Sequence, residues 1–224
     1  MRESTHTAAV EDYLRALYKL EESGSEGTTT ALARSVGVAP ASATAMLKRL
    51  EGLGLVERLP YRAARLTAAG RRAALRVTRT HRLLERYLAE TLDVPITHVH
   101  DEADRLEHTL SPELGDRLDE LLGRPTHDPH GHPIPSADLS PGWEVMRTLD
   151  QVEAGEETTV RQVPDDDPAL LDYLARINIV PGEAVTVTAF GPFDGPVTVR
   201  TRIGDVAISR ALASVVRVTD SPGS

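Results

Sequence analysis

A short segment of the chain, HVHDEADRLEHT at residues 98–109, is dense in side chains that can bind a cation. Placed on a helix of 3.6 residues per turn, four of them project within roughly a 100° arc. These four are His100, Asp104, Glu107 and His108. Such a group on one face is costly unless a cation satisfies it. The spacing therefore favours a metal site.

Other candidate ligands lie in two earlier segments. His81 and Glu85 form an i, i+4 pair, and Asp12 stands beside apolar neighbours. Salt bridges are the alternative for any one of these side chains. The arginines close in sequence are Arg82, Arg86 and Arg105. For the whole set, cation binding explains the pattern better than a solvated surface does.

These ligands must be positioned by a mainly helical framework. Apolar periodicity predicts helices over 8–22, 29–36, 40–53, 68–92, 97–109 and 112–122. Two short strands are expected around the turn at 60–63. The order helix, helix, short turn, helix and β-ribbon is that of a winged helix-turn-helix.

In the C-terminal part of the chain the spacing of apolar residues changes from a helical to a strand-like pattern. It is rich in β-branched residues, which favour strands. We expect strands at 185–190, 197–203 and 206–218 in a small β-barrel, and a short helix near 165–175. The predicted fold class is mainly α with small β. The expected domains are a DNA-binding domain at 1–75, a helical domain at 76–140, a linker at 141–157 and the β-rich domain at 158–224.

Charge is distributed unevenly along the chain. The formal net charge is -9, but residues 28–75 hold 8 basic and only 2 acidic residues. A basic segment in an acidic chain predicts one nucleic-acid face. Cysteine is absent, which fits a reducing compartment. No apolar run reaches the roughly 20 residues of a membrane span, so we expect a cytoplasmic protein without a membrane partner.

The second helix of a helix-turn-helix lies in the major groove and exposes its first residues to the bases. In this chain its first residues are small, so methyl contacts and DNA shape are expected to carry specificity. The candidate DNA-binding residues are Ala39, Pro40, Ala41, Ser42, Thr44, Lys48, Arg49 and Arg62. A winged helix that packs only against protein is the alternative, but the local positive charge argues against it.

Four segments resemble the diphtheria toxin repressor family of metal-dependent transcriptional regulators. They are EDYLRALYKLEE at 11–22, THRLLERYL at 80–88, HDEADRLEHTLS at 100–111 and DPHGHPIP at 128–135. The resemblance covers nearly the whole chain. It implies a winged helix, a dimerisation domain and an SH3-like (FeoA-like) domain, and hence a homodimer that binds double-stranded operator DNA.

The resemblance also implies two metal sites. The family's primary site corresponds to Asp12, Asp104, Glu107 and His108. Its ancillary site corresponds to His81, Glu85 and His100. In longer members an acidic or amide side chain of the SH3-like domain completes the ancillary site. We expect Asp167 in that role, with Asp165, Asp166 and Asp172 as alternatives in a loose alignment.

Departures from the family pattern bear on the metal. Iron-responsive members carry methionine and cysteine where this chain has Asp12 and Asp104, and hard oxygen ligands favour Mn²⁺. We expect Mn²⁺, then Fe²⁺, with Zn²⁺ or Co²⁺ able to bind in vitro. Manganese-responsive members carry a glutamate where Arg15 stands here, which argues against their two-manganese cluster and favours the ancillary site as the second site.

Three histidines remain outside these sets. His127, His130 and His132 are spaced like a metal cluster, but they lie among prolines and glycine in the segment that resembles a structural loop of the family. We therefore expect a structural role for them.

The sequence thus predicts a metal-activated DNA-binding regulator of metal-ion homeostasis, not an enzyme. A metallohydrolase is one alternative, because His/Asp/Glu clusters also activate water. No nucleophile elbow or HExxH motif supports it. A dimer module with a purely structural metal is the other alternative.

Overall fold

The computed structural model describes residues 6–58, 63–142 and 146–220. These residues divide into two compact units. The first lies within Met1–Leu84, Asp104–Thr126 and Ile134–Trp143, and the second within Glu85–Ala103, His127–Pro133 and Glu144–Ser224. Each unit is considered by itself below.

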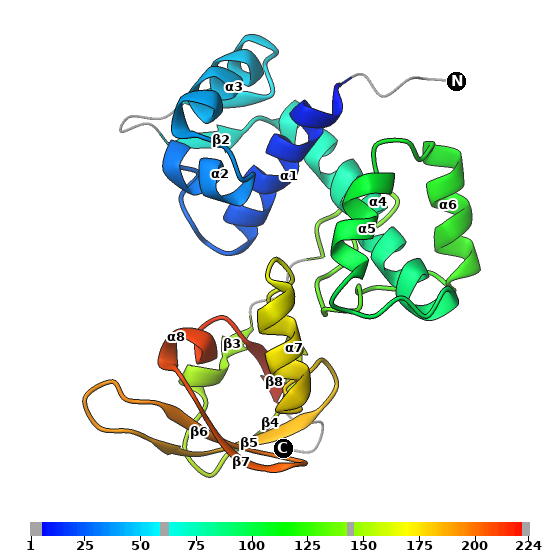
Figure 1. Cartoon of the computed structure of the whole chain (residues 1–224). Helices are drawn as coiled ribbons and strands as arrows, with labels where there is room; N and C mark the ends of the chain where they lie inside the picture. Colours follow the sequence, from blue (N-terminus) through cyan, green and yellow to red (C-terminus); the bar gives the residue numbers. More distant parts are fainter. Residues whose placement is uncertain (1–5, 59–62, 143–145, 221–224) are drawn as a thin grey trace. The chain divides into compact units, whose positions relative to one another are not determined.

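The first unit contains the predicted winged helix-turn-helix (Figure 1). Its elements are α1 (Ala8–Glu22), α2 (Thr29–Ser35), α3 (Pro40–Gly52), β1 (Val56–Arg58) and β2 (Ala64–Leu66). The two strands pair antiparallel, with Val56 opposite Leu66. The helices enclose one apolar core in which Leu14, Leu32 and Leu47 are fully buried. Packing against this core determines which side of α3 is exposed to solvent.

Three further helices follow, namely α4 (Ala68–Thr91), α5 (Val99–Leu106) and α6 (Pro112–Leu121). They agree with the predicted helices except that α5 is shorter than the expected 97–109. It ends at Leu106, and residues 107–109 form a turn in which Thr109 donates both its N–H and its hydroxyl to the Leu106 carbonyl. Glu107 and His108 therefore stand in a turn and not on a regular helix.

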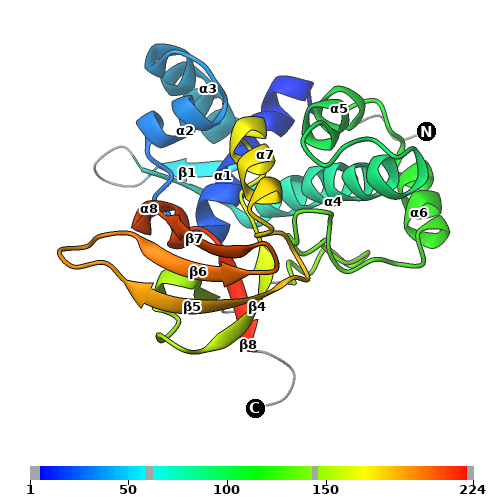
Figure 2. The ribbon, with the colours of Figure 1, turned by 60° about the horizontal axis from the view of Figure 1, so that its bottom comes forward.

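The second unit is built on a six-stranded antiparallel sheet (Figure 2). Its strand order is β3 (Arg147–Thr148), β8 (Arg217–Asp220), β4 (Glu157–Gln162), β5 (Ala184–Phe190), β6 (Val197–Thr201) and β7 (Gly204–Ile208). The short helix α7 (Pro168–Arg176) joins β4 to β5. Alternate strand residues such as Val185, Val187, Val197 and Val199 are buried in a second apolar core.

The expected single strand at 206–218 is wrong. This stretch forms β7, the short helix α8 (Arg210–Ala213) and β8. Ser209 starts the helix by accepting a hydrogen bond from Leu212 N–H, and the alanines that follow favour a helical turn. The sheet also includes strands for which the sequence analysis gave no expectation. One of these, β3, lies inside the segment 141–157 that we expected to be a linker.

Over the described ranges, the structure contains no helix that is both long and apolar enough to cross a membrane.

Candidate metal centres and DNA-binding surface

The first candidate metal centre consists of Asp12, Glu107 and His108. Each offers one ligand atom, and these atoms lie within 4.8 Å of one another. Asp12 comes from α1, whereas Glu107 and His108 come from the turn after α5. The Nε2 of His108 lies 2.8 Å from Asp12 Oδ1 and 3.3 Å from Glu107 Oε1. We call this group the first cluster.

Glu11 holds the other side of the His108 ring. Its Oε2 lies 2.8 Å from His108 Nδ1. Both ring nitrogens of His108 thus lie 2.8 Å from a carboxylate oxygen, and both donate when the ring is protonated. Once Nε2 gives up its hydrogen while Nδ1 still donates to Glu11, the Nε2 lone pair can bind a metal ion beside Asp12 and Glu107. Glu11 was not among the predicted site residues. Its position directly before Asp12 in the sequence gave no signal of this contact.

Proton binding in this cluster reflects burial and charge. Burial raises the pKa of the Asp12 carboxyl, although His108 beside it acts in the opposite direction. Burial lowers the pKa of the His108 imidazole, but the hydrogen bond with Glu11 and the charges of Glu107 and Asp12 outweigh it, so the pKa is raised. A metal ion must displace protons from these groups.

Glu107 shows that the residues of the first cluster fit a cation. Its side chain is 0% exposed. Among the described residues, its Oε1 atom is buried without a hydrogen-bond partner. A positive group close to it is the guanidinium of Arg15, whose Nε lies 3.4 Å away. A buried carboxylate oxygen is costly unless positive charge offsets it, and a bound cation would add to that compensation. Two carboxylates and one imidazole around such an atom are a suitable donor set for a divalent metal ion.

The predicted ligands Asp104 and His81 lie next to the first cluster and contact Arg15. The Nη2 of Arg15 lies 2.6 Å from Asp104 Oδ1, and its Nη1 lies 3.2 Å from the ring nitrogens of His81. The Nδ1 of His81 lies 2.7 Å from Glu107 Oε2. His81, predicted for the ancillary site, therefore contacts Glu107, which was predicted for the primary site.

The second candidate metal centre lies in the second unit. It joins two overlapping groups, each with ligand atoms within 4.8 Å of one another. We call their union the second cluster, and its members are Glu85, Asp128, His130, His132 and Asp165. All five are buried. Glu85 comes from α4, whereas the other four come from two loops.

His130 is the clearest candidate ligand of the second cluster. Its Nε2 lies 3.1 Å from the carbonyl oxygen of Ile96, which can only accept, so Nε2 carries the hydrogen. Nδ1 is then left with its lone pair. It is buried without a hydrogen-bond partner among the described residues and lies 3.8 Å from Glu85 Oε1. This is the geometry of an imidazole oriented to bind a cation.

Asp128 shapes the loop that carries His130. Asp128 Oδ1 accepts hydrogen bonds from the backbone N–H groups of His130 and His132, both at 2.9 Å. Asp128 Oδ2 lies 3.4 Å from His132 Nδ1. A structural role was expected for the three histidines of this loop. The structure places two of them in a candidate metal centre, whereas His127 contacts Arg161.

His100 and Asp165 lie close to Glu85 or to each other, whereas Asp167 does not take part in the second cluster. The Nδ1 of His100 lies 2.9 Å from Glu85 Oε1 and 3.9 Å from Asp165 Oδ2. Asp167, the expected C-terminal ligand, is exposed and caps α7 by accepting from the N–H groups of Ala169 and Leu170. The neighbouring Asp165, one of the alternatives, stands in the cluster instead. The chain turns between the two residues, so only one faces inward.

The predicted DNA-binding residues lie on the outer side of α3. Those that the structure describes are exposed, namely Ala39, Pro40, Ala41, Ser42, Thr44, Lys48 and Arg49. The Thr44 hydroxyl donates to the Pro40 carbonyl within α3. Arg62 lies outside the described residues. The inner side of α3, including Leu47 and Leu50, packs in the core and so holds the outer side in place.

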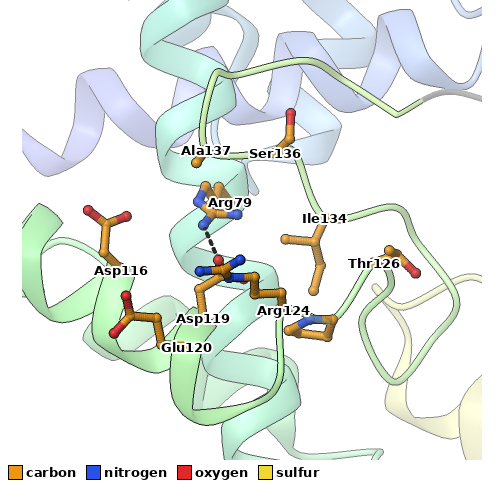
Figure 3. Close-up of a pocket in the computed structure, with 10 residues that line it drawn as sticks. Arg79, Asp116, Asp119, Glu120, Arg124, Thr126, Ile134, Ser136 and Ala137 are labelled. Carbon is orange, nitrogen blue, oxygen red and sulfur yellow. Dashed lines mark ion pairs between the residues drawn. The ribbon is translucent and has the colours of Figure 1, made fainter.

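A cavity of about 490 Å³ in the first unit shares no residue with either cluster (Figure 3). The Nη2 of Arg79 and Oδ2 of Asp119 form an ion pair across it at 2.9 Å. Arg124, Asp116 and Glu120 also line it, together with uncharged residues such as Ile134, and its lining includes no histidine.

Three family models match consecutive parts of the chain. They are the N-terminal DNA binding domain of iron dependent repressors at 6–64, the metal binding and dimerisation domain of iron dependent repressors at 67–136, and the FeoA domain at 147–220. In these terms Asp12 lies in the DNA-binding domain and Glu107 and His108 in the metal-binding domain. The fold and the first cluster thus define a metal-responsive DNA-binding regulator.

Individual relatives and solved structures agree with these family models. The iron-dependent repressor IdeR of Mycobacterium tuberculosis is 32% identical over 220 residues, which are 93% of this chain and 95% of the relative. A manganese-dependent transcriptional repressor in complex with manganese has a TM-score of 0.88 at 36% identity, covering 95% of this chain and 100% of that chain. The manganese regulator SloR has a TM-score of 0.83 at 28% identity, covering 95% and 98%.

The chain belongs to the diphtheria toxin repressor family of metal-dependent transcriptional repressors. This confirms the predicted family, fold class and regulatory function. Relatives and structural neighbours are transcriptional repressors and not enzymes, so the metallohydrolase alternative is set aside.

Proposed function

We propose that this chain is a manganese-preferring, homodimeric repressor whose DNA-binding conformation is set by metal bound at the first cluster. The observation that carries the proposal is the position of Asp12. It belongs to the DNA-binding domain, yet its carboxylate lies 2.8 Å from the imidazole of His108, which belongs to the metal-binding domain. A divalent ion held by Asp12, Glu107 and His108 would join the two domains.

The residues of the first cluster support this coupling. In the protein without metal, the carboxylates of Asp12 and Glu107 repel each other, and the imidazole of His108 lies between them. Cation binding removes the repulsion and favours one orientation of α1 relative to the helical domain. That orientation is expected to set two recognition helices of a dimer at successive major grooves of operator DNA.

The donor types favour Mn²⁺, followed by Fe²⁺. Asp12, Asp104 and Glu107 offer carboxylate oxygens, His108 offers one imidazole, and the chain contains no cysteine. Oxygen-rich sites suit Mn²⁺, whereas sulfur donors suit softer ions. Zn²⁺ and Co²⁺ bind more strongly in the general order of metal affinities and are therefore expected to compete in vitro. The protein would act in the cytoplasm. The genes that it regulates would serve metal-ion homeostasis.

We propose the second cluster as a further metal centre. It replaces the expected set of His81, Glu85, His100 and Asp167 with Glu85, His130 and Asp165 as ligands. Asp128 and His132 complete the second cluster, and His100 lies beside it with Nδ1 2.9 Å from Glu85 Oε1. Its role would be to stabilise the second unit and to tune the response, while the first cluster controls DNA binding.

Operator binding with and without metal tests the function. The variants Asp12→Asn and Glu107→Gln keep the side-chain shape but remove a ligand charge. Both are expected to bind operator DNA no more tightly with Mn²⁺ than without it, as measured by fluorescence anisotropy. The exposed acid Asp101 on α5 supplies the control Asp101→Asn, which should respond to Mn²⁺ like the wild type.

Two results would contradict the proposal. Wild-type metal dependence in both ligand variants would show that the first cluster does not control DNA binding. Operator affinity of the wild type that does not change between metal-free buffer and micromolar Mn²⁺ would instead support a structural metal without a sensing role.

A further inference from the structure

Beside the first cluster, one positive side chain lies among three potential metal ligands. The guanidinium of Arg15 contacts the Oδ1 of Asp104 at 2.6 Å, the ring nitrogens of His81 at 3.2 Å and the Oε1 of Glu107 at 3.4 Å. The Arg15 side chain is 18% exposed, so solvent screens these contacts only in part. Two carboxylates and an imidazole would otherwise form a donor set of their own.

We propose that Arg15 is a tethered cation that occupies the position of a second metal ion, so that the first cluster binds one ion and not two. The inference rests on the proposed function, because it assumes that metal binds at Asp12, Glu107 and His108. It adds a determinant of stoichiometry at that site. The same arginine would also hold Asp104, a predicted ligand, in an ion pair that a metal ion must compete with.

The charges around the site support this role. Four carboxylates gather there, those of Glu11, Asp12, Asp104 and Glu107, and Arg15 supplies one positive charge. One divalent ion together with Arg15 leaves a single negative charge when all four carboxylates are ionised. Two divalent ions together with Arg15 would leave a net positive charge in a partly buried site, which is unfavourable.

The geometry of Glu107 shows how both cations share one ligand. Its Oε1 lies 3.3 Å from Nε2 of His108 and 3.4 Å from Nε of Arg15. Its Oε2 lies 2.7 Å from Nδ1 of His81. A carboxylate that bridges two cations is typical of two-metal sites, in which the ions are about 3.5–4 Å apart. In this chain, one of those two positions is filled by the guanidinium.

Electron paramagnetic resonance of Mn²⁺-loaded protein tests the inference. Two Mn²⁺ ions in one cluster couple magnetically, whereas an isolated ion gives the six-line signal, so the coupled signal is separate from any ion bound at the second cluster. We expect uncoupled Mn²⁺ in the wild type. Arg15→Ala is expected to show the coupled signal and to bind one additional ion per chain in equilibrium dialysis.

Further variants separate the effect of the Arg15 charge from that of its side-chain shape, and a spectroscopic check identifies misfolded variants. Arg15→Gln should behave like Arg15→Ala, and Arg15→Lys should keep the uncoupled signal because it retains the positive charge. Arg76, an exposed arginine on α4, gives the control Arg76→Ala, which should match the wild type. Circular dichroism of each variant establishes that it is folded.

The outcomes distinguish this inference from the proposed function. A coupled signal in the wild type, or no additional ion in folded Arg15→Ala and Arg15→Gln, would overturn the role of Arg15 and leave the proposed function intact. A coupled signal from Arg15→Lys would overturn it as well, because the charge would not be the determinant. Failure of the wild type to bind any Mn²⁺ would contradict the proposed function itself.

Discussion

Individual side chains in both clusters are oriented by partners that do not themselves form the predicted site. Glu11 holds one ring nitrogen of His108, and the Ile96 carbonyl accepts from one ring nitrogen of His130. In each case the opposite nitrogen is left facing carboxylates. These contacts hold the rings in the orientation that a metal ligand requires, and partners of this kind usually matter for affinity. The sequence indicated the histidines but not their partners.

Glu11→Gln tests the orienting contact of the first cluster. The amide can still hydrogen-bond to His108 but no longer makes the imidazole more basic, so Mn²⁺ affinity is expected to fall about 10–100-fold. Competition with a fluorescent chelator measures this change. Glu26→Gln, at an exposed glutamate after α1, is the matched control. Equal affinities in the two variants would contradict a role for Glu11.

His130→Ala tests the second cluster. Because Nδ1 of His130 is the clearest free donor there, its removal is expected to reduce the number of Mn²⁺ ions bound per chain by one in equilibrium dialysis. The exposed His98 supplies the control His98→Ala, which should leave the number unchanged. A full complement of ions in His130→Ala would rule out the second cluster as a metal centre.

At the scale of elements, short irregular segments place most of the ligands. The turn after α5 carries Glu107 and His108, and the loop at 127–133 carries Asp128, His130 and His132. Gly131 in that loop has φ +88°, and a Cβ atom there would lie 1.8 Å from the carbonyl oxygen of Arg161. The loop can therefore approach β4 closely only with glycine at this position.

Gly131→Ala should accordingly destabilise the second unit. We expect the free energy of unfolding to fall by about 2–4 kcal/mol, from left-handed backbone strain and the clash with Arg161 together. Gly155→Ala isolates the strain, because Gly155 has φ +92° but nothing within 4 Å of its Cβ position. It should cost only about 1 kcal/mol. Urea denaturation measures both, and equal losses would show that the close approach is unimportant.

Two basic residues of the recognition helix α3 are expected to contact DNA phosphates. Lys48 and Arg49 are exposed and near the end of the helix, where they suit phosphate contacts. Alanine at either position should lower the slope of log affinity against log salt by about 0.9, with little change in sequence preference. Arg76→Ala serves as the control. An unchanged slope in both α3 variants would place the DNA contacts elsewhere.

At the scale of the whole molecule, the net charge of -9 includes the carboxylates assigned to cation binding. Divalent ions would offset part of this charge and stabilise the folded state, because unfolded chains lack the clusters. Saturating Mn²⁺ at 100 times Kd is expected to add about 2.7 kcal/mol per site to the free energy of unfolding. Thermal denaturation with Mn²⁺ and with a chelator measures it. An identical Tm in both would contradict metal binding by the native state.

The sequence by itself determined the class of protein and most of its helices. Apolar periodicity located α1 to α4 and α6, because each helix buries one face in a core. Composition showed that oxygen and imidazole donors were available without cysteine. The types and spacing at 100–108 indicated a metal site, since unpaired charged groups on one face need a counter-charge.

Only the tertiary structure decided which of these residues meet. It separated Asp165 from its neighbour Asp167, which caps a helix, and it brought His130 to Glu85, far away in sequence. It also placed Arg15 among candidate ligands. Contacts of this kind depend on loop paths and on the packing of distant segments, which local periodicity does not encode. The residue types followed from the sequence, and their partners followed from the fold.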